Sequence, residues 1–195
     1  MDIIFDIGKV LIDFDFDEFV RGIVPADRAD IVAKAMFGNP EWTELDRGVL
    51  PVEEVLQRFI ACAPEYEWDI RKVFSKLGDI PRLRPDTIPM IQDLKSRGHR
   101  VFYLSNYFEF LMHAAPQVLR FTRLTDGGIF SCNEKIVKPD RAIYDLLCSR
   151  YGITKENAVF IDDSPKNISG AENAGIRGIL YTGQNREGLY REIGI

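Results

Sequence analysis

Short apolar runs alternate with longer amphipathic segments along most of the chain. Runs rich in β-branched and aromatic residues predict strands at 3–5, 101–104, 129–131, 158–161 and 179–181. Apolar residues at three-to-four spacing predict helices over 86–97, 141–151, 167–174 and 187–193, and another from about residue 108. Glycines at 98, 152 and 175 follow three of these helices, as is common at helix ends. This alternation indicates a parallel sheet with helices on both faces.

The segment from 15 to 83 departs from that alternation. Helical spacing recurs at 18–24, 26–37, 52–63 and 66–77, and no strand pattern interrupts it, so we expect the segment to be entirely helical. Pro51 stands where a helix could begin. We therefore predict an α/β fold, with a doubly wound, Rossmann-like core over 1–14 and 84–195 and a helical cap inserted over 15–83.

Composition narrows the classes of function. The 195 residues are 46% hydrophobic and carry a net charge of −5 without a Lys/Arg block, so we expect no nucleic-acid partner. No apolar stretch has the length of about 20 residues that a membrane helix needs, and the first residues lack a basic leader. The three cysteines form no CxxC pair and suggest a reducing compartment. We expect a cytoplasmic enzyme without a membrane partner.

Polar residues that could take part in catalysis or ligand binding follow three of the predicted strands. Asp6 follows the first, Ser105 and Asn106 follow the second, and Asp162 with Asp163 follow the strand at 158–161. The carboxyl ends of parallel strands meet at one edge of the sheet, where ligands bind in such folds. Lys138 precedes a helix that Pro139 or Asp140 would begin, and it would reach the same edge.

This set of residues suits phosphoryl transfer. Carboxylates from different strands form a hard oxygen site of the kind that Mg²⁺ prefers. An Asp carboxylate can act as a covalent nucleophile, and a lysine with a cation would relieve the repulsion among crowded carboxylates. Phosphoryl transfer depends mostly on positioning and on charge stabilisation. This set of residues therefore predicts a magnesium-dependent enzyme that transfers a phosphoryl group.

Four segments together resemble the haloacid dehalogenase superfamily of hydrolases, and in particular its phosphatases with a helical cap. They are Ile4-Phe5-Asp6-Ile7-Gly8-Lys9-Val10-Leu11, Tyr103-Leu104-Ser105-Asn106, Val137-Lys138-Pro139-Asp140, and Phe160-Ile161-Asp162-Asp163-Ser164-Pro165-Lys166-Asn167. Their order and spacing agree with that family over nearly the whole chain. Glu44 to Gly48, before a helix begun by proline, is similar to the family's first cap type. The first segment is similar to that of small sugar-phosphate phosphatases and of phosphatase domains related to those of soluble epoxide hydrolases.

The resemblance implies magnesium-dependent hydrolysis of a small-molecule phosphomonoester, and it implies a role for each matching residue. Asp6 would be the nucleophile and a metal ligand, Gly8 would offer its carbonyl oxygen to the metal, and Asp163 would be the second carboxylate on it. Lys138 would brace the phosphate and Asp6. The remaining matches would hold the phosphoryl group (Ser105 and Asn106) or support Lys138 and the metal site (Asp162 and Asn167).

Gly8 departs from the pattern of most phosphatases in this superfamily. They carry a second Asp at that position, which acts as general acid and base, a role worth about 10²–10⁴-fold in rate. A substrate with a good leaving group, such as an anomeric sugar phosphate, would suffer least from the loss. Asp13 or Asp15 could otherwise substitute, and Lys9 is a further unusual residue in the segment.

Two other functions stay open at this point. One is a dehalogenase that uses Asp6 on a carbon–halogen bond, which needs neither a metal nor a second Asp. The other is a catalytically weakened binding or regulatory domain that has kept the fold. Within the cap, we expect Phe37, Trp42 and Phe59 to form its core and Arg47 to pair with Glu44 or Asp46. Tyr107 is as well suited to a substrate pocket as to the core.

Overall fold

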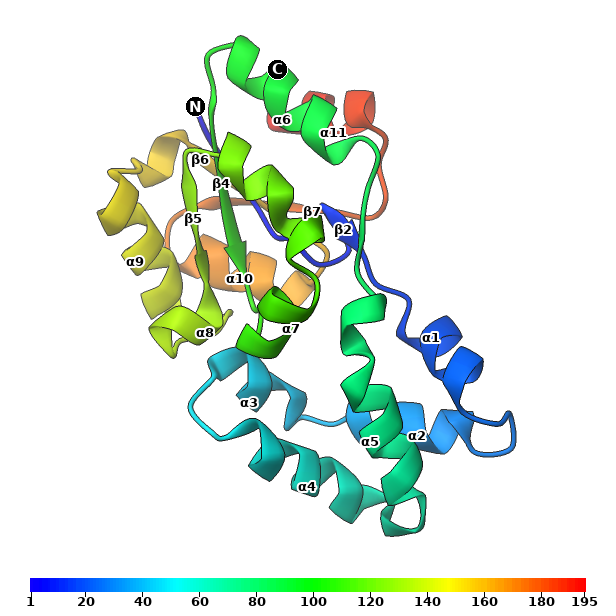
Figure 1. Cartoon of the computed structure of the whole chain (residues 1–195). Helices are drawn as coiled ribbons and strands as arrows, with labels where there is room; N and C mark the ends of the chain where they lie inside the picture. The colour runs from blue at the N-terminus through cyan, green and yellow to red at the C-terminus, as the bar shows by residue number, and fades with distance from the viewer.

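Five parallel strands form the central sheet of the computed structural model, which describes residues 1–195 (Figure 1). In spatial order they are β5 (Gly127–Phe130), β4 (Arg100–Ser105), β1 (Asp2–Phe5), β6 (Ala158–Asp162) and β7 (Arg177–Leu180). The central strand β1 pairs with β4 and β6, and all four of its residues are buried. A strand covered on both faces has to be apolar throughout, which explains the continuous run Ile3-Ile4-Phe5.

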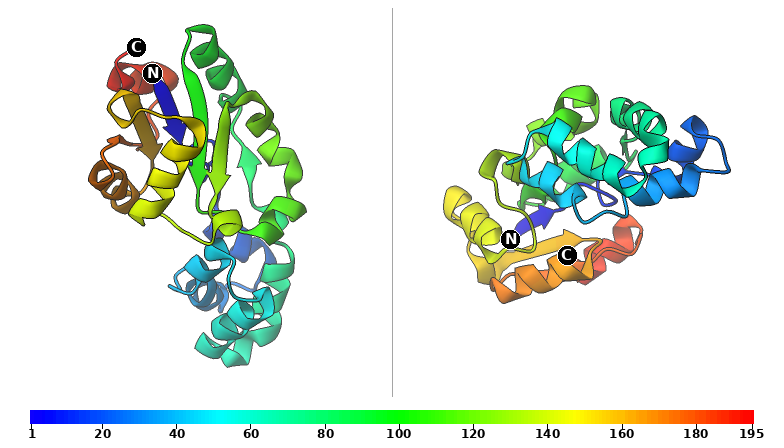
Figure 2. Two further views of the ribbon diagram at one scale, coloured as in Figure 1. Left: turned by 90° about the vertical axis from the view of Figure 1, so that its left-hand side faces the viewer. Right: turned by 90° about the horizontal axis from the view of Figure 1, so that it is seen from below.

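Helices cover both faces of this sheet (Figure 2, left). On one face α9 (Arg141–Tyr151) and α10 (Pro165–Asn173) pack on Ile4, Phe102 and Phe160. On the other face α6 (Thr87–Ser96), the 3-10 helix η3 (Pro116–Leu124) and α11 (Arg186–Ile193) pack on Ile3 and Ile161. Successive side chains of a strand point to opposite faces, so the two hydrophobic clusters share no residue. The predicted α/β fold with a parallel sheet is confirmed.

The segment between β1 and α6 forms a helical insert, defined here as α1 to α5. Its helices are α1 (Phe16–Ile23), α2 (Ala29–Met36), α3 (Trp42–Arg47), α4 (Val52–Cys62) and α5 (Glu67–Ser75), followed by the short 3-10 helix η2 (Leu77–Asp79). Two short strands, β2 (Ile12–Asp13) and β3 (Arg82–Leu83), pair antiparallel where the chain leaves and re-enters the core. The expectation that 15–83 is entirely helical is therefore wrong at residues 82 and 83, because their backbone pairs with a distant strand.

The insert lies beyond the carboxyl ends of the strands, and the strand arrows point toward it (Figures 1 and 2). Its helix α3 packs on α8 (Ser131–Glu134), a single turn that follows β5. Ser131 had been expected to end a strand, but it begins this turn instead. The insert therefore packs on a short helix of the core. The remaining helix of the core, α7 (Glu109–Ala114), follows β4. None of the helices combines the length and the apolar character that crossing a membrane requires.

Candidate active site

A buried cluster of charges lies at the carboxyl edge of the sheet. Lys138 Nζ is 2.7 Å from Asp6 Oδ1 and 2.6 Å from Asp162 Oδ2. Asp6 directly follows β1, Asp162 ends β6, and Lys138 comes from the loop before α9. The Asp162 carboxylate also accepts hydrogen bonds from the Ser164 backbone N–H and from Asn167 Nδ2. Asp162 is therefore fully engaged, which leaves Asp6 as the member of the cluster that meets the open space beside it.

The electrostatic balance of this cluster keeps the lysine charged. Burial alone would lower the pKa of Lys138, but the two carboxylates on either side hold it above its usual value. Burial raises the pKa of Asp6 to about 6, and the Lys138 ammonium opposes that rise. An ion pair buried this deeply persists only because each partner has the other and additional hydrogen bonds. At neutral pH Asp6 is available as an anion beside a cation.

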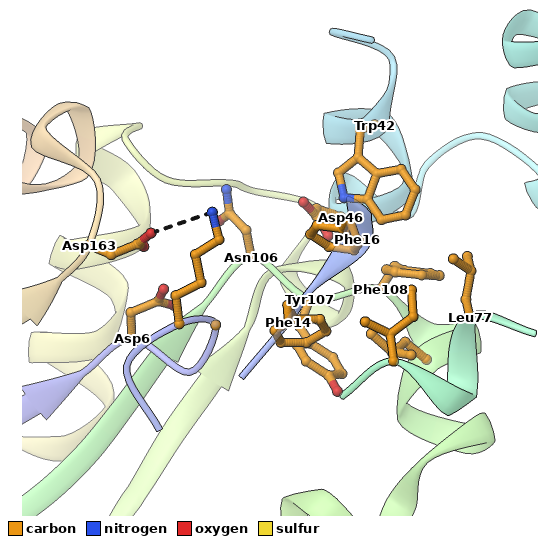
Figure 3. A pocket seen from close by; sticks show the side chains of 14 residues that line it. Asp6, Phe14, Phe16, Trp42, Asp46, Leu77, Asn106, Tyr107, Phe108 and Asp163 are labelled. Atoms are coloured by element: carbon orange, nitrogen blue, oxygen red, sulfur yellow. Dashed lines mark ion pairs between the residues drawn. The ribbon is translucent and has the colours of Figure 1, made fainter. Parts of the chain in front are cut away.

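Asp163 adds a third carboxylate to the edge. Carboxylate oxygens of Asp6, Asp162 and Asp163 lie within 4.8 Å of one another. Burial, with Asp162 as a second cause, raises the pKa of Asp163, and its side chain stays 31% exposed. Only Lys9, 4.0 Å away and itself exposed, pairs with it (Figure 3). Three carboxylates around one buried ammonium carry excess negative charge and offer hard oxygen ligands, so the residues present fit a divalent cation such as Mg²⁺. Asp6 and Asp163 could hold it, with the backbone of Gly8 alongside.

Asn106 and Ser105 behave differently. The Asn106 side chain accepts a hydrogen bond from the Lys138 backbone N–H at 2.8 Å and donates one to the Lys138 carbonyl at 3.1 Å. It also lines the cavity described next. Ser105 is only 1% exposed, is not part of the cavity lining, and makes one long contact with the Asn106 carbonyl oxygen. The structure thus brings Asn106 into the site and leaves Ser105 behind it.

A cavity of about 360 Å³ opens between the sheet edge and the insert. Its polar lining at the sheet edge consists of Asp6, Gly8, Lys9, Asn106 and Asp163, and Asp46 enters from α3 of the insert. The rest of the lining is hydrophobic and largely aromatic, as Figure 3 shows. These residues are Phe14, Phe16, Trp42, Leu77, Ile80, Tyr107, Phe108 and Leu111. The cavity therefore joins a charged floor to an apolar wall.

Asp46 is the residue of the insert that brings a carboxyl group into this cavity. It is 9% exposed, and its carboxyl group makes no hydrogen bond or ion pair within the chain. Burial raises its pKa to about 7, against the pull of Lys138, while the negative charge of Asp6 raises it further. In Figure 3 it lies between Asn106 and Trp42. Asp46 therefore lines the same cavity as Asp6.

Several sequence expectations about neighbouring residues have a clear outcome. Asp13 pairs with Arg84 at 2.6 Å, and Asp15 accepts a hydrogen bond from the Glu18 backbone N–H at the start of α1, so neither lines the cavity. Arg47 pairs with Glu44 at 3.3 Å, as expected. Tyr107 lines the cavity.

The sequence interpretation missed Trp42 and Asp46 as cavity residues. A signal existed, because the two are four positions apart on one helix and therefore share a face. Trp42 does touch the core of the insert, where its ring stacks on Phe59, but it also reaches the cavity. An acidic side chain on the same helix face as a tryptophan can face either the protein core or a ligand cavity. The sequence alone does not distinguish the two.

The doubly wound sheet and the buried Asp–Lys–Asp cluster at its carboxyl edge define an α/β protein with a candidate catalytic site. A protein-family model described as haloacid dehalogenase-like hydrolase matches residues 3–175. The chain belongs to that family.

Proteins similar to this chain differ in what they do. The chain is 30% identical over 104 residues to (S)-2-haloacid dehalogenase 4A of Burkholderia cepacia, a match over 53% of this chain and 44% of that protein. It is 24% identical over 182 residues to the sesquiterpene phosphatase astK of Aspergillus oryzae, covering 92% and 88% of the two chains. It is 26% identical over 189 residues to drimenol cyclase drtB of Aspergillus calidoustus, covering 92% of this chain and 33% of that protein. The chain thus spans less than half of two of these relatives.

Solved structures share the whole fold. A predicted HAD-like family hydrolase from Porphyromonas gingivalis superposes with a TM-score of 0.74 at 22% identity, over 100% of this chain and 98% of that one. The HAD family enzyme bt-2542 from Bacteroides thetaiotaomicron, solved in complex with magnesium and inorganic phosphate, gives a TM-score of 0.70 at 17% identity, over 97% and 98%. At these identities the likeness concerns the fold.

Proposed function

We propose that this protein hydrolyses a small phosphomonoester in a magnesium-dependent reaction, through an aspartyl-phosphate on Asp6. The observation that carries the proposal is the Lys138 ammonium 2.7 Å from Asp6, beside the further carboxylate of Asp163 at the floor of a cavity. A nucleophilic carboxylate has to be anionic and held in place, and Lys138 supports both conditions. We also propose that residues 15–83 act as a cap that keeps bulk water from the reacting groups.

The residues at the sheet edge have distinct parts in this reaction. Asp6 attacks the phosphorus atom, and the bond between phosphorus and the leaving oxygen breaks. Lys138 balances charge on Asp6 and on the phosphoryl oxygens, while Asn106, which lines the cavity, holds the phosphoryl group. Water then attacks the phosphorus of the aspartyl-phosphate and releases Asp6. Asp6, Asp163 and the Gly8 carbonyl would hold Mg²⁺, which supplies positive charge to the phosphoryl oxygens when bound.

The walls of the cavity favour an apolar organic group on the substrate. Five aromatic residues, Phe14, Phe16, Trp42, Tyr107 and Phe108, contribute to them. A sugar would lose hydrogen bonds to water there and find few partners, since the polar lining lies at the floor apart from Asp46. A relative that covers 92% of the chain is a sesquiterpene phosphatase, which is in keeping with such a group. We therefore place phosphates of apolar alcohols ahead of the sugar phosphates that the sequence suggested.

Dehalogenation is the second candidate. The (S)-2-haloacid dehalogenase relative and the absence of a second Asp at Gly8 favour it. In that reaction Asp6 would attack carbon and release a halide, and no cation would be needed. The excess of carboxylates around Asp6 supports the phosphatase instead, because a substrate carboxylate without a cation would be repelled there.

The test is phosphate release from geranyl monophosphate, benzyl phosphate, glucose 1-phosphate and glucose 6-phosphate, each with Mg²⁺ and with EDTA. We expect release only with Mg²⁺, with kcat/KM at least about tenfold higher for the apolar esters. Asp163→Asn should raise the Mg²⁺ concentration needed for half-maximal rate. Release of chloride from 2-chloropropionate in EDTA, without phosphatase activity, would establish the second candidate in place of the first.

A further inference from the structure

Hydrolysis of an apolar alcohol phosphate requires a proton on the departing oxygen, because an alkoxide is a poor leaving group. The charged floor has no free group for this step. Asp6 is the proposed nucleophile, Asp163 the proposed cation ligand, and Lys138 and Asp162 are bound to each other. Of the carboxyl groups that line the cavity, Asp46 alone has no assigned task.

We propose that Asp46 of the helical insert is the general acid and base of this site. Its carboxyl group faces the cavity from the side opposite the sheet edge, without a hydrogen-bond partner in the chain (Figure 3). The inference rests on the proposed phosphatase function. In the first step the protonated Asp46 gives its proton to the leaving oxygen as the P–O bond breaks. In the second step the Asp46 anion takes a proton from the water that attacks the aspartyl-phosphate, and the P–O bond to Asp6 breaks.

The backbone of Asp46 is held firmly against the core. Its carbonyl oxygen accepts a hydrogen bond from Ser131 Oγ at 2.6 Å, and Ser131 Oγ accepts one from the Tyr107 backbone N–H at 3.0 Å. Ser131 is fully buried. Tyr107 directly follows Asn106, so one short chain of hydrogen bonds connects the loop that positions Lys138 with the residue that carries the proton.

A second attachment lies two residues further along. Lys135 Nζ donates to the Gly48 carbonyl at 2.6 Å, and Gly48 ends α3 in a left-handed conformation with φ of 65°. A Cβ atom at this position would come within 3.1 Å of Cys132 Cβ and of Lys135 Nζ. Glycine therefore allows α3 to approach α8 closely. General acid catalysis needs such placement, since proton transfer occurs only within hydrogen-bond reach.

The protonation behaviour of Asp46 agrees with this role. Burial raises its pKa to about 7, so both forms are populated near neutral pH. The groups that face it are Asp6 and Lys138 across the cavity and Tyr107 and Cys132 from the core, with Glu44 and Arg47 on its own helix. Glu44 and Arg47 pair with each other, which leaves Asp46 without a local cation.

The test compares kcat/KM for p-nitrophenyl, phenyl and benzyl phosphate, whose leaving groups are increasingly basic while the apolar ring stays similar. Wild type should show a shallow dependence on leaving-group basicity. Asp46→Asn should lose about 10²–10⁴-fold on benzyl phosphate and far less on p-nitrophenyl phosphate. Glu44→Gln, the same change of charge on the same helix, should resemble wild type, because Glu44 does not line the cavity.

A second variant tests whether an acid placed at another position can replace Asp46. A Cβ at Gly8 would have only ordinary contacts, 3.8 Å from Phe14 and 3.9 Å from Asp6 Oδ2, so Gly8→Asp has room beside the nucleophile. In the Asp46→Asn background it should recover benzyl phosphate hydrolysis at least about tenfold.

Three results would overturn the role of Asp46. The first is an equal loss of kcat/KM on all three esters in Asp46→Asn, which would indicate a binding role. The second is no loss on any of the three esters. The third is a steep dependence of kcat/KM on leaving-group basicity in wild type. The last needs no variant. If wild type hydrolyses none of the esters, the proposed phosphatase function itself fails, and that result differs from the other three.

Discussion

Asn106 and Lys138 hold each other through two hydrogen bonds, from the Lys138 N–H to Asn106 Oδ1 and from Asn106 Nδ2 to the Lys138 carbonyl oxygen. The Asn106 side chain thus pairs with both backbone groups of Lys138, as a neighbouring β-strand would. The ammonium of Lys138 thereby reaches Asp6 from a fixed base. Asn106 thus positions the lysine and also borders the cavity.

Asn106→Ala should therefore lower kcat by about 10²-fold, because a small displacement of Lys138 weakens charge stabilisation at Asp6. Steady-state kinetics with benzyl phosphate measures this. Asn157→Ala, an exposed asparagine far along the chain, is the matched control and should have no effect. An Asn106→Ala enzyme with wild-type kcat would contradict the importance of the two hydrogen bonds.

Asp6→Asn should abolish turnover, with kcat at least about 10³-fold lower, because an amide cannot form the aspartyl-phosphate. The fold should survive, since Lys138 keeps its ion pair with Asp162. Phosphate release and circular dichroism together check both statements. Substantial activity in a folded Asp6→Asn protein would exclude Asp6 as the nucleophile.

Lys138→Met should destabilise the protein by about 3–5 kcal/mol, because it leaves two buried carboxylates without their cation. Urea unfolding at pH 7.5 in EDTA measures the difference. Lys9→Met is the control, since Lys9 is exposed and its only ion pair is 4.0 Å long; it should change stability by less than about 1 kcal/mol. Equal effects of the two substitutions would mean that the buried cluster does not depend on Lys138.

Asp46 should make stability depend on pH in a defined direction. Its pKa in the folded chain, about 7, exceeds the usual 3.8, so the fold favours the protonated form. Its favourable contribution is present below pH 3.8 and is lost as pH rises through about 7. Asp46→Asn stays neutral, so at pH 8 it should be more stable than wild type by up to about 4 kcal/mol, and this advantage should shrink toward pH 4.

Urea unfolding of wild type and Asp46→Asn at pH 5 and pH 8, in EDTA, measures that difference. Glu44→Gln, on the same helix, again serves as the control. A difference that is the same at both pH values would show that Asp46 is not held in a protonated state by the fold.

Gly48→Ala should cost about 1–2 kcal/mol, because an added Cβ meets Cys132 and Lys135 and the left-handed backbone disfavours a side chain. Gly152→Ala separates the two causes. Gly152 has a similar φ of 58° but no atom within 4 Å of the added Cβ, so only the backbone term remains. Thermal unfolding of both variants measures them, and equal losses would mean that the contact between α3 and α8 contributes little.

The order of elements and the residues at the strand ends could be predicted from the sequence. Apolar runs of strand length and three-to-four spacing are local properties, and the carboxyl ends of parallel strands meet at one edge whatever the details of packing. For that reason Asp6, Asn106, Asp162 and Asp163 were expected together, and they lie together.

The tertiary structure decided which of these residues face substrate and what the insert contributes. Asp162 and Asp163 are adjacent and chemically alike, but one is sealed against Lys138 and Asn167 while the other stays partly exposed. Asp46 and Trp42 enter the cavity only because α3 docks on α8, through contacts between residues more than 80 positions apart. Such contacts depend on shape and burial between distant segments, whereas the local pattern of the chain records only which face of each element is apolar.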